Sequence, residues 1–222
     1  MTSDLLKDGA KVLGLSITDE VLDKLLAFGR LLLKWNKTYN LTAIDSEDDV
    51  VIRHILDSLS IVATYQKTFG NTAKVLDVGS GGGLPGIPLA IYFPNYEITL
   101  CDSVKKKAAF LRQVAVELNL TNVHIFVGRV EEMPDAVFDA ISSRAFASLE
   151  DFVNLTKKFA VDKTQWMAMK GKFPKDEIER LPKNFLVKQV IQLSVPFLNE
   201  ERHLVILAKK SLKTSKISQH EY

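Results

Sequence analysis

The stretch that decides the fold is Val75-Leu76-Asp77-Val78-Gly79-Ser80-Gly81-Gly82-Gly83-Leu84-Pro85-Gly86. It opens with an apolar run interrupted by one aspartate, which is typical of a strand buried on both faces of a sheet. Glycines follow at once, and proline then stands where a helix can begin. A strand, a glycine-rich turn and a helix form the first part of a βαβ nucleotide-binding unit, because glycine lets the backbone adopt positive φ and approach a ligand closely.

The glycines fit two registers that predict different ligands. Residues 81–86 match the dinucleotide fingerprint G-x-G-x-x-G, whereas residues 79–83 match G-x-G-x-G, the shorter pattern of S-adenosylmethionine (SAM) methyltransferases. We favour SAM, because the shorter pattern begins where the strand ends and Pro85 offers no N–H to a pyrophosphate. Asp77 is then placed to receive the ammonium group of the cofactor. The alternative is a plain turn between strand and helix, without a ligand.

A second acidic residue strengthens the prediction of a nucleoside site. Residues 96–101 predict a second strand, and Asp102 follows it, 24 positions after Val78. At about this spacing a carboxylate commonly meets a ribose, and an ionised carboxylate has enough lone pairs to accept both ribose hydroxyls. The alternative is that Asp102 caps the next helix.

The composition is that of a globular protein. Of 222 residues, 46% are hydrophobic and 25% charged. No apolar run approaches the roughly 20 residues of a membrane span, and the start does not resemble a signal peptide. Cys101 is the single cysteine, which excludes an internal disulfide and suits a reducing cytosol. The histidines show no ligand spacing. We therefore expect a cytoplasmic protein with no metal and no membrane partner, and we expect it to be a monomer.

Positive charge is placed unevenly along the chain. The formal net charge of +2 is too small to indicate nucleic-acid binding by itself. Basic residues gather after two predicted strands and near the end of the chain: Lys105, Lys106, Lys107, Arg112, Lys170, Lys172, Lys175, Lys209, Lys210, Lys213 and Lys216. A solvated surface explains the terminal group, whereas the groups that follow strand ends suggest a binding edge.

The hydrophobic pattern divides the chain into three parts. Residues 1–70 predict an N-terminal helical extension that packs on a sheet domain, 71–210 predict that domain, and 211–222 form a basic tail. We expect strands at 74–78, 97–101, 124–127, 138–143, 166–169, 185–193 and 203–208. We expect helices between them at 85–93, 104–118, 149–160 and 175–181. This alternation predicts an α/β, Rossmann-like methyltransferase fold with a mostly parallel seven-stranded sheet and an antiparallel last strand.

Ligands of such sheets bind at the carboxyl ends of the strands. We expect Val130 and Glu131, after the third strand, to lie beside an adenine. Arg129, Arg144 and Lys170 bring positive charge to the same edge. The alternative for these three cations is ordinary ion pairing with Glu131 or Glu132.

A further pair stands in the helical extension. Arg53-His54 and Asp57-Ser58 lie about one helical turn apart. A catalytic His–Asp pair is one interpretation, but residues at this spacing pair routinely on helix surfaces, so we favour a structural role.

With these residues assembled, the chain resembles the ribosomal RNA small subunit methyltransferase G family, also called the glucose-inhibited division protein B family. The resemblance covers almost the whole length. It rests on an ordered set of segments: residues 35–36, 40–42, 53–54, 57–59, 77–86, 106–107, 110–111, 128–132, 143–145 and 170–171. It implies a bacterial, cytoplasmic enzyme that moves the methyl group of SAM to N7 of one guanine in 16S ribosomal RNA.

The resemblance also implies which residues contact the cofactor. These are Gly79, Leu84, Asp102, Val130, Glu131 and Arg144, and the glycine motif itself adds Asp77 and Gly81. The chain departs from the family pattern in two places. Leu84 stands where many members have phenylalanine, and no glycine precedes the fifth strand near residues 163–165.

Guanine N7 carries an exposed lone pair at neutral pH, so this reaction requires alignment rather than a general base. We expect Arg129, Arg144 and Lys170 to hold RNA phosphate or the acceptor edge of the guanine. Cys101 could act as a nucleophile, but a buried core thiol is the favoured interpretation. Two other function classes stay open: a nicotinamide-dependent oxidoreductase and a non-catalytic RNA-binding module.

Overall fold

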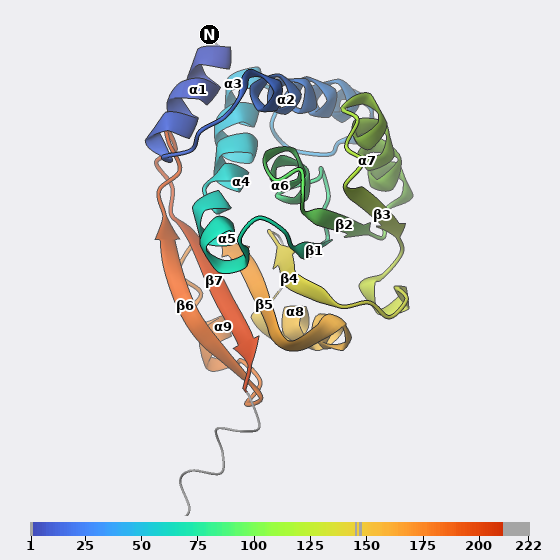
Figure 1. The fold of residues 1–222 in the computed structure, drawn as a ribbon, viewed down its shortest axis with the longest axis vertical. Helices are drawn as coiled ribbons and strands as arrows, with labels where there is room; N and C mark the ends of the chain where they lie inside the picture. Colours follow the sequence, from blue (N-terminus) through green and yellow to red (C-terminus); the bar gives the residue numbers. More distant parts are fainter. Residues whose placement is uncertain (1, 145, 147, 211–222) are drawn as a thin grey trace, which may run out of the picture.

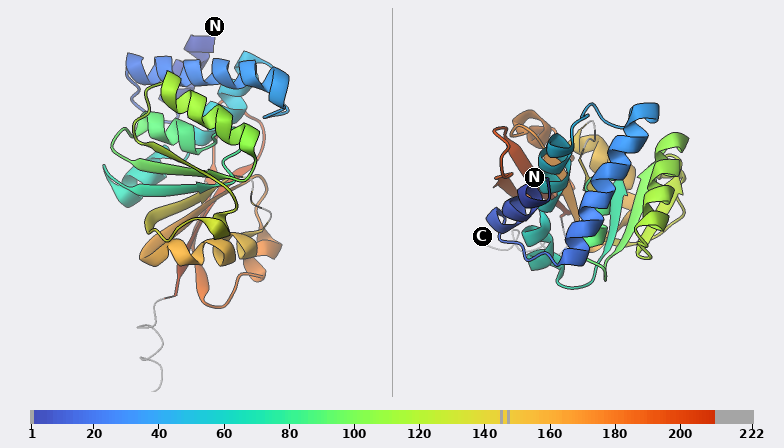
Figure 2. Two further views of the ribbon diagram at one scale, coloured as in Figure 1. Left: turned by 90° about the vertical axis from the view of Figure 1, so that its right-hand side faces the viewer. Right: turned by 90° about the horizontal axis from the view of Figure 1, so that it is seen from above.

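The computed structural model describes residues 2–144, 146 and 148–210. Its centre is a seven-stranded sheet in the order β3-β2-β1-β4-β5-β7-β6, enclosed by helices on both faces (Figures 1 and 2). The strands are β1 Lys74–Val78, β2 Glu97–Asp102, β3 Val123–Val127, β4 Phe138–Ser143, β5 Ala160–Lys170, β6 Phe185–Leu193 and β7 Arg202–Lys209. Among the described strands, β7 alone runs in the opposite direction to the other six, so the predicted fold class is confirmed.

One face of the sheet carries the N-terminal helices and the first two helices of the α/β part. They are α1 Thr2–Val12, α2 Asp19–Tyr39, α3 Glu47–Val50, a π-helical segment Val51–Leu56, α4 Asp57–Leu59, α5 Val62–Phe69, α6 Gly86–Tyr92 and α7 Lys105–Glu117. The other face carries α8 Leu149–Thr156 and α9 Lys175–Glu179. Side-chain caps fix some helix starts: Thr18 accepts a hydrogen bond from the Val21 N–H, and Ser148 accepts one from the Asp151 N–H.

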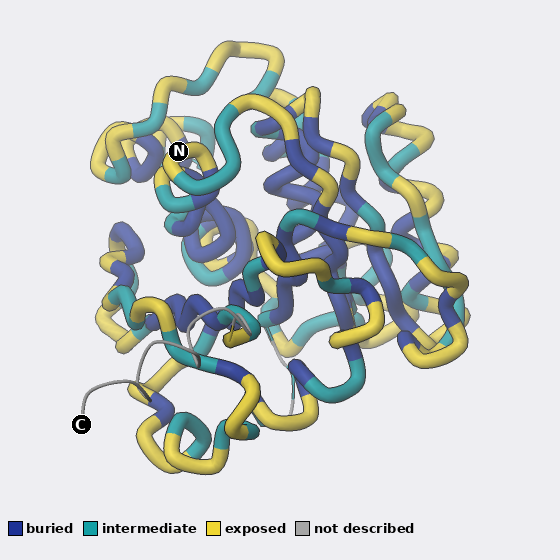
Figure 3. The backbone as a smooth tube through the Cα atoms, turned by 60° about the horizontal axis from the view of Figure 1, so that its bottom comes forward, coloured by how far each residue is buried: buried dark blue, intermediate teal, exposed yellow. Residues whose placement is uncertain are grey.

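The sheet is buried on both faces, as its apolar strands predict. In β5, Met167 and Met169 face the larger core beneath the N-terminal helices, whereas Trp166 and Ala168 face the smaller core beneath α8. Buried positions gather along the central strands, and exposed ones lie mainly on outer turns (Figure 3). No helix within the described part of the chain has the length and apolar character to cross a bilayer.

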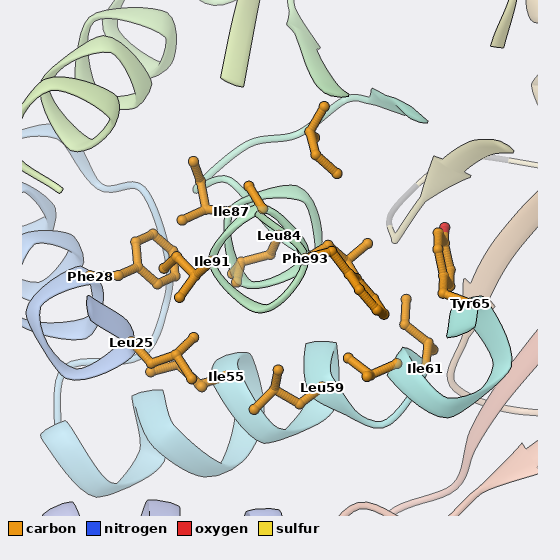
Figure 4. Close-up of a cluster of buried hydrophobic side chains, with 14 of the residues drawn as sticks. Leu25, Phe28, Ile55, Leu59, Ile61, Tyr65, Leu84, Ile87, Ile91 and Phe93 are labelled. Atoms are coloured by element: carbon orange, nitrogen blue, oxygen red, sulfur yellow. The ribbon is translucent and has the colours of Figure 1, made fainter. Parts of the chain in front are cut away.

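The larger core joins the N-terminal helices to the glycine-rich turn. Figure 4 shows Leu84, Ile87 and Ile91 beside Phe28 of α2 and Ile55 of the π-helical segment. The extension therefore covers the helix that follows the turn. The division of the chain at residues 70 and 210 stays a prediction, and the predicted tail 211–222 lies outside the described residues.

Two predicted elements differ from the structure. The helix expected at 149–160 is α-helical only to Thr156, and the fifth strand starts at Ala160 instead of 166. The exposed start of β5 lacks an apolar pattern, but it pairs with β4 across a register shift, and the Thr164 hydroxyl donates to the Phe138 carbonyl.

Candidate active site

The glycine-rich turn uses its glycines for backbone conformation. Gly79, Gly81 and Gly83, the three glycines of the shorter register, have φ values of +70°, +57° and +84°. Gly86 is required for a different reason, because a Cβ there would contact Leu100 and lie 2.8 Å from the Asp77 carboxylate. The turn thus brings its backbone to the end of β1 while α6 packs closely on the sheet.

Asp102 holds this turn in place from the end of the neighbouring strand. Its Oδ2 accepts a hydrogen bond from the Gly81 N–H at 2.9 Å, and its Oδ1 accepts one from the Val104 N–H at 2.8 Å. The residue is 7% exposed. Each oxygen keeps a further lone pair for an outside donor, so the carboxylate supports the start of α7 and can also accept two hydroxyl groups.

A hollow of about 450 Å³ lies beside this carboxylate. We call it the glycine-loop hollow. Its lining is Val78, Gly79, Cys101, Asp102, Ser103, Val104, Lys107, Gly128, Arg129, Val130, Glu131, Phe146 and Leu155. The chain reaches it after β3 through a short 3-10 turn, Val130–Glu132, which Lys158 supports by donating to the Glu131 and Met133 carbonyls. The hollow combines an acidic residue with apolar walls, as a nucleoside site requires.

Two of the predicted cofactor residues lie beneath the turn. The Asp77 side chain is fully buried, and its Oδ2 accepts a hydrogen bond from the Gly86 N–H at 3.1 Å. Burial raises the pKa of this carboxyl to about 7. The Leu84 side chain packs in the core (Figure 4), so only its backbone faces the turn. A direct contact between Asp77 and a ligand would require the turn to move.

Cys101 lines the hollow with a thiol that is poorly suited to nucleophilic attack. Burial, followed by the nearby carboxylates of Asp102 and Asp77, raises the pKa of the thiol to about 12. Its Sγ lies 3.7 Å from the Gly128 carbonyl oxygen. These contacts support the interpretation of Cys101 as a core thiol.

A second hollow, of about 380 Å³, lies at the same edge of the sheet. We call it the basic hollow. Its lining is Ile44, Arg53, His54, Asp57, Arg144, Met169, Lys170, Gly171 and Arg202. These residues come from the N-terminal helices, from the ends of β4 and β5, and from the start of β7. Chain segments that are distant in sequence therefore build one cationic recess.

Asp57 is the centre of this hollow. It is 3% exposed in its side chain and lies between two guanidinium groups: Arg144 Nη1 is 3.2 Å from Oδ2, and Arg202 Nε is 3.0 Å from Oδ1. Glu200 extends the network by pairing with both Arg202 and Arg53. Burial raises the pKa of the Asp57 carboxyl, and the two guanidinium groups oppose that shift. Each carboxylate oxygen accepts one N–H group from one arginine, so Asp57 holds both side chains in position.

His54 forms the inner wall beside Arg144. Its Nε2 lies 2.8 Å from the Thr42 hydroxyl, and its Nδ1 lies 3.3 Å from Arg144 Nη1. Burial and then the positive charge of Arg144 lower the pKa of the imidazole to about 4. His54 is therefore neutral at pH 7. It contacts Arg144 instead of forming the His–Asp pair considered from the sequence.

The structure separates the three predicted substrate-positioning cations. Arg129 lines the glycine-loop hollow with an exposed side chain, whereas Arg144 and Lys170 line the basic hollow. The alternative partners Glu131 and Glu132 are wrong for the latter two, since Arg144 pairs with Asp57, and Lys170 pairs with Glu177 at 2.8 Å. Four residues that line the basic hollow were not among the site residues predicted from the sequence: Arg53, His54, Asp57 and Arg202. Only the first three stood in a segment that carried the family resemblance.

The two hollows are neighbours across the segment that follows β4. The Ser143 hydroxyl donates to the Val78 carbonyl at 3.0 Å, which ties the end of β4 to β1. Phe146 lines the glycine-loop hollow, and its carbonyl lies 3.4 Å from Lys170 Nζ in the basic hollow. A hydrogen bond between Lys170 and the Phe146 carbonyl therefore links the walls of the two hollows.

The comparison with known families decides the assignment. Residues 21–205 match the family model described as rRNA small subunit methyltransferase G. The chain belongs to this family. It is 48% identical over 205 residues to ribosomal RNA small subunit methyltransferase G of Neisseria gonorrhoeae, covering 92% of this chain and 97% of the relative. It is 49% identical over 208 residues to the protein of that name from Pseudomonas aeruginosa, covering 93% and 95%.

Solved structures share the fold at low identity. The crystal structure of MtNAS in complex with MTA and tNA has a TM-score of 0.58 at 12% identity and covers 95% of this chain and 86% of that one. A ribosomal protein L11 methylase from Lactobacillus delbrueckii has a TM-score of 0.55 at 15% identity, covering 70% and 77%. The predicted family and the predicted class of enzyme, an rRNA methyltransferase of the Rossmann-like type, are confirmed. Among residues 2–144, 146 and 148–210, no group of three acidic, histidine or cysteine side chains is placed to hold a metal ion.

Proposed function

We propose that this member of the rRNA small subunit methyltransferase G family transfers the methyl group of SAM to N7 of a guanine in 16S ribosomal RNA. The observation that carries the proposal is the pair of adjoining hollows. One is built around Asp102 and a glycine turn and suits a nucleoside, and the other is lined by four cations and suits RNA.

The residues of the glycine-loop hollow fit the cofactor. SAM supplies an activated methyl group on its sulfonium when bound. Asp102 has lone pairs free for the ribose hydroxyls, and Val130 and Glu131 line the same hollow, which supports the prediction that they contact the adenine. Gly79 and Gly81 leave the backbone open to the methionine part. The assignments of Asp77, Leu84 and Arg144 as cofactor contacts rest on the sequence alone and stay predictions.

The chain's own contribution to the chemistry is alignment. The N7 lone pair of guanine is available at neutral pH, so a bond from N7 to the methyl carbon can form as the bond from sulfur breaks, without removal of a proton. Arg144 and Lys170 are placed to hold the guanine through its O6 acceptor or through a neighbouring phosphate, and Arg129 is placed to contact RNA at the rim. Neutral His54 leaves the Asp57 pairing with Arg144 undisturbed.

The partner is 16S RNA, either protein-free or within a small-subunit particle. Both named relatives are ribosomal RNA small subunit methyltransferases, and the basic hollow has the charge that an RNA substrate requires. We further infer that the enzyme acts as a monomer in the cytoplasm, where small subunits are assembled.

The test is methyl transfer from radiolabelled SAM to small subunits, and to their extracted RNA, from a strain that lacks this gene. The expected result is label at one guanine of 16S RNA, identified as N7-methylguanine by reverse-transcription mapping. SAM binding without label on either substrate would point to another methyl acceptor. Binding of nicotinamide cofactor in place of SAM would restore the oxidoreductase alternative, and RNA binding indifferent to SAM would restore the non-catalytic one.

A further inference from the structure

A third hollow continues from the basic hollow. It has a volume of about 390 Å³ and is lined by residues 170–177, between the end of β5 and α9. We call it the Phe173 hollow. Lys170 and Gly171 line both hollows, so the chain leaving β5 forms a wall that they share. Whatever occupies the basic hollow has this recess beside it.

Phe173 presents its ring to solvent at this hollow. The residue is 53% exposed, although burying a phenylalanine ring would contribute about 1.5–3 kcal/mol. The ring is also held in place. It meets the ring of His203 nearly at a right angle, with centroids 5.8 Å apart, and His203 Nδ1 lies 2.8 Å from the Gly171 carbonyl oxygen. His203 is buried, so Phe173 is an exposed aromatic surface on a fixed support.

The charges around this ring favour an anionic occupant. Lys172 and Lys175 are exposed and make no ion pair with any residue that the structure describes. Glu177, an acidic residue of the hollow, is already engaged by Lys170 Nζ at 2.8 Å and by the Leu149 N–H at 2.8 Å. Asp176 is the remaining carboxylate against two unpaired lysines, so the rim is net positive.

A second exposed phenylalanine, equally exposed but with different charges around it, provides a matched comparison for Phe173. Phe197 lies in the connection between β6 and β7 and is 55% exposed. Its loop carries Glu200 and Glu201 instead of lysines. The two rings are matched in exposure and differ in charge surroundings, and only Phe173 adjoins the wall of the basic hollow.

We propose that the Phe173 hollow binds the nucleotide next to the target guanine, with its base stacked on Phe173 and its phosphate met by Lys172 and Lys175. This inference rests on the proposed function, because it requires RNA in the basic hollow. Unpaired bases of RNA commonly stack on aromatic side chains, and lysines neutralise the backbone beside them. Binding of the neighbouring nucleotide thereby helps to position the target guanine, which Arg144 and Lys170 contact directly.

The test compares four enzymes on whichever RNA substrate the wild type methylates. Phe173→Leu keeps an apolar side chain but removes the aromatic face, and Phe173→Tyr keeps that face. Phe197→Leu makes the same change at the matched ring. We expect Phe173→Leu to raise the KM for RNA about tenfold, and Phe173→Tyr and Phe197→Leu to stay within about twofold of wild type. SAM affinity, measured by calorimetry, should be unchanged in all four.

An unchanged KM in Phe173→Leu would overturn the inference, and so would an equal loss in Phe173→Tyr or in Phe197→Leu. In each of these cases the wild type still methylates RNA, so the proposed function stands. Absence of RNA methylation by the wild type itself would instead refute the proposed function.

Discussion

The glycine-loop hollow and the basic hollow stand at the same edge of the sheet but are built in different ways. The first is made largely by backbone: positive-φ glycines, the N–H groups that Asp102 accepts, and a short turn after β3. The second is made by charged side chains from the N-terminal helices, β4, β5 and β7. The difference indicates that the proposed cofactor site depends mainly on local backbone geometry, whereas the proposed RNA site depends on side chains that folding brings together from distant segments.

One buried aspartate, Asp57, lies in the basic hollow and another, Asp77, lies beneath the glycine turn, and the two have different partners. Asp57 lies between the guanidinium groups of Arg144 and Arg202, so its charge is compensated by charge. The Asp77 carboxylate accepts one hydrogen bond, from the Gly86 N–H, and its Oδ1 has no hydrogen-bond partner among the described residues. Removing the Asp57 carboxylate should therefore lower the stability, whereas removing the Asp77 carboxylate should raise it at the pH at which Asp77 is ionised.

The largest effect is expected at the acidic residue of the glycine-loop hollow. Asp102→Ala removes the acceptor proposed for the ribose and leaves the Gly81 and Val104 N–H groups without their partner. The two hydrogen bonds proposed between the ribose hydroxyls and this carboxylate each contribute about 1.5–3 kcal/mol. Their loss corresponds to a decrease in SAM affinity of at least about a hundredfold. Isothermal titration calorimetry measures it. Asp102→Asn, which keeps one acceptor oxygen, should lose less, and an Asp102→Ala variant with near-normal affinity would contradict the assignment.

Arg144 distinguishes the two hollows most directly. Arg144→Lys keeps the charge but removes the planar guanidinium, whose Nη1 reaches Asp57 and which is proposed to hold the RNA, so kcat/KM for RNA should fall about 10- to 100-fold. Because Arg144 lines the basic hollow alone, the affinity for SAM should change by less than about threefold. The matched control is Arg129→Lys in the glycine-loop hollow. A large loss of SAM affinity in Arg144→Lys would favour the cofactor role predicted from the sequence.

The bridging aspartate should support stability more than cofactor binding. Asp57→Ala leaves Arg144 and Arg202 facing each other without their shared carboxylate, and both guanidinium groups are largely buried. Breaking such a pair costs about 3–5 kcal/mol when it is fully buried, so we expect a loss of about 2–4 kcal/mol in urea unfolding. Glu200→Ala, which removes an exposed partner of the same Arg202, should cost less than about 1 kcal/mol. Equal losses in the two variants would refute the central role of Asp57.

The sequence predicted the strands and the glycine turn because both depend on neighbours in the chain. Strand, turn and carboxylate follow one another from Val75 to Asp102, and local residue types dictate their conformation. The basic hollow could not be predicted in this way. Asp57 meets Arg144 and Arg202 across 87 and 145 positions, so only the folded chain shows that they are partners. The early start of β5 was missed for the same reason, since pairing with β4 decides it.

The carboxylate of Asp77, buried beneath the glycine turn, should destabilise the protein when it ionises, whereas the carboxylate of Asp57 stabilises it. The folded-state pKa of Asp77, about 7, lies above the value near 4 of an unfolded aspartyl side chain, so the folded protein binds this proton more tightly. The stability that protonated Asp77 contributes is therefore complete below about pH 4 and is lost as the pH rises toward about 7. Asp77→Asn cannot ionise. Its unfolding free energy relative to wild type should increase by about 1–3 kcal/mol between pH 4.5 and 7.5, measured by urea unfolding at about those two pH values. A difference that does not change with pH would show that Asp77 is compensated as fully as Asp57, and the contrast between the two hollows would then lie only in their surfaces.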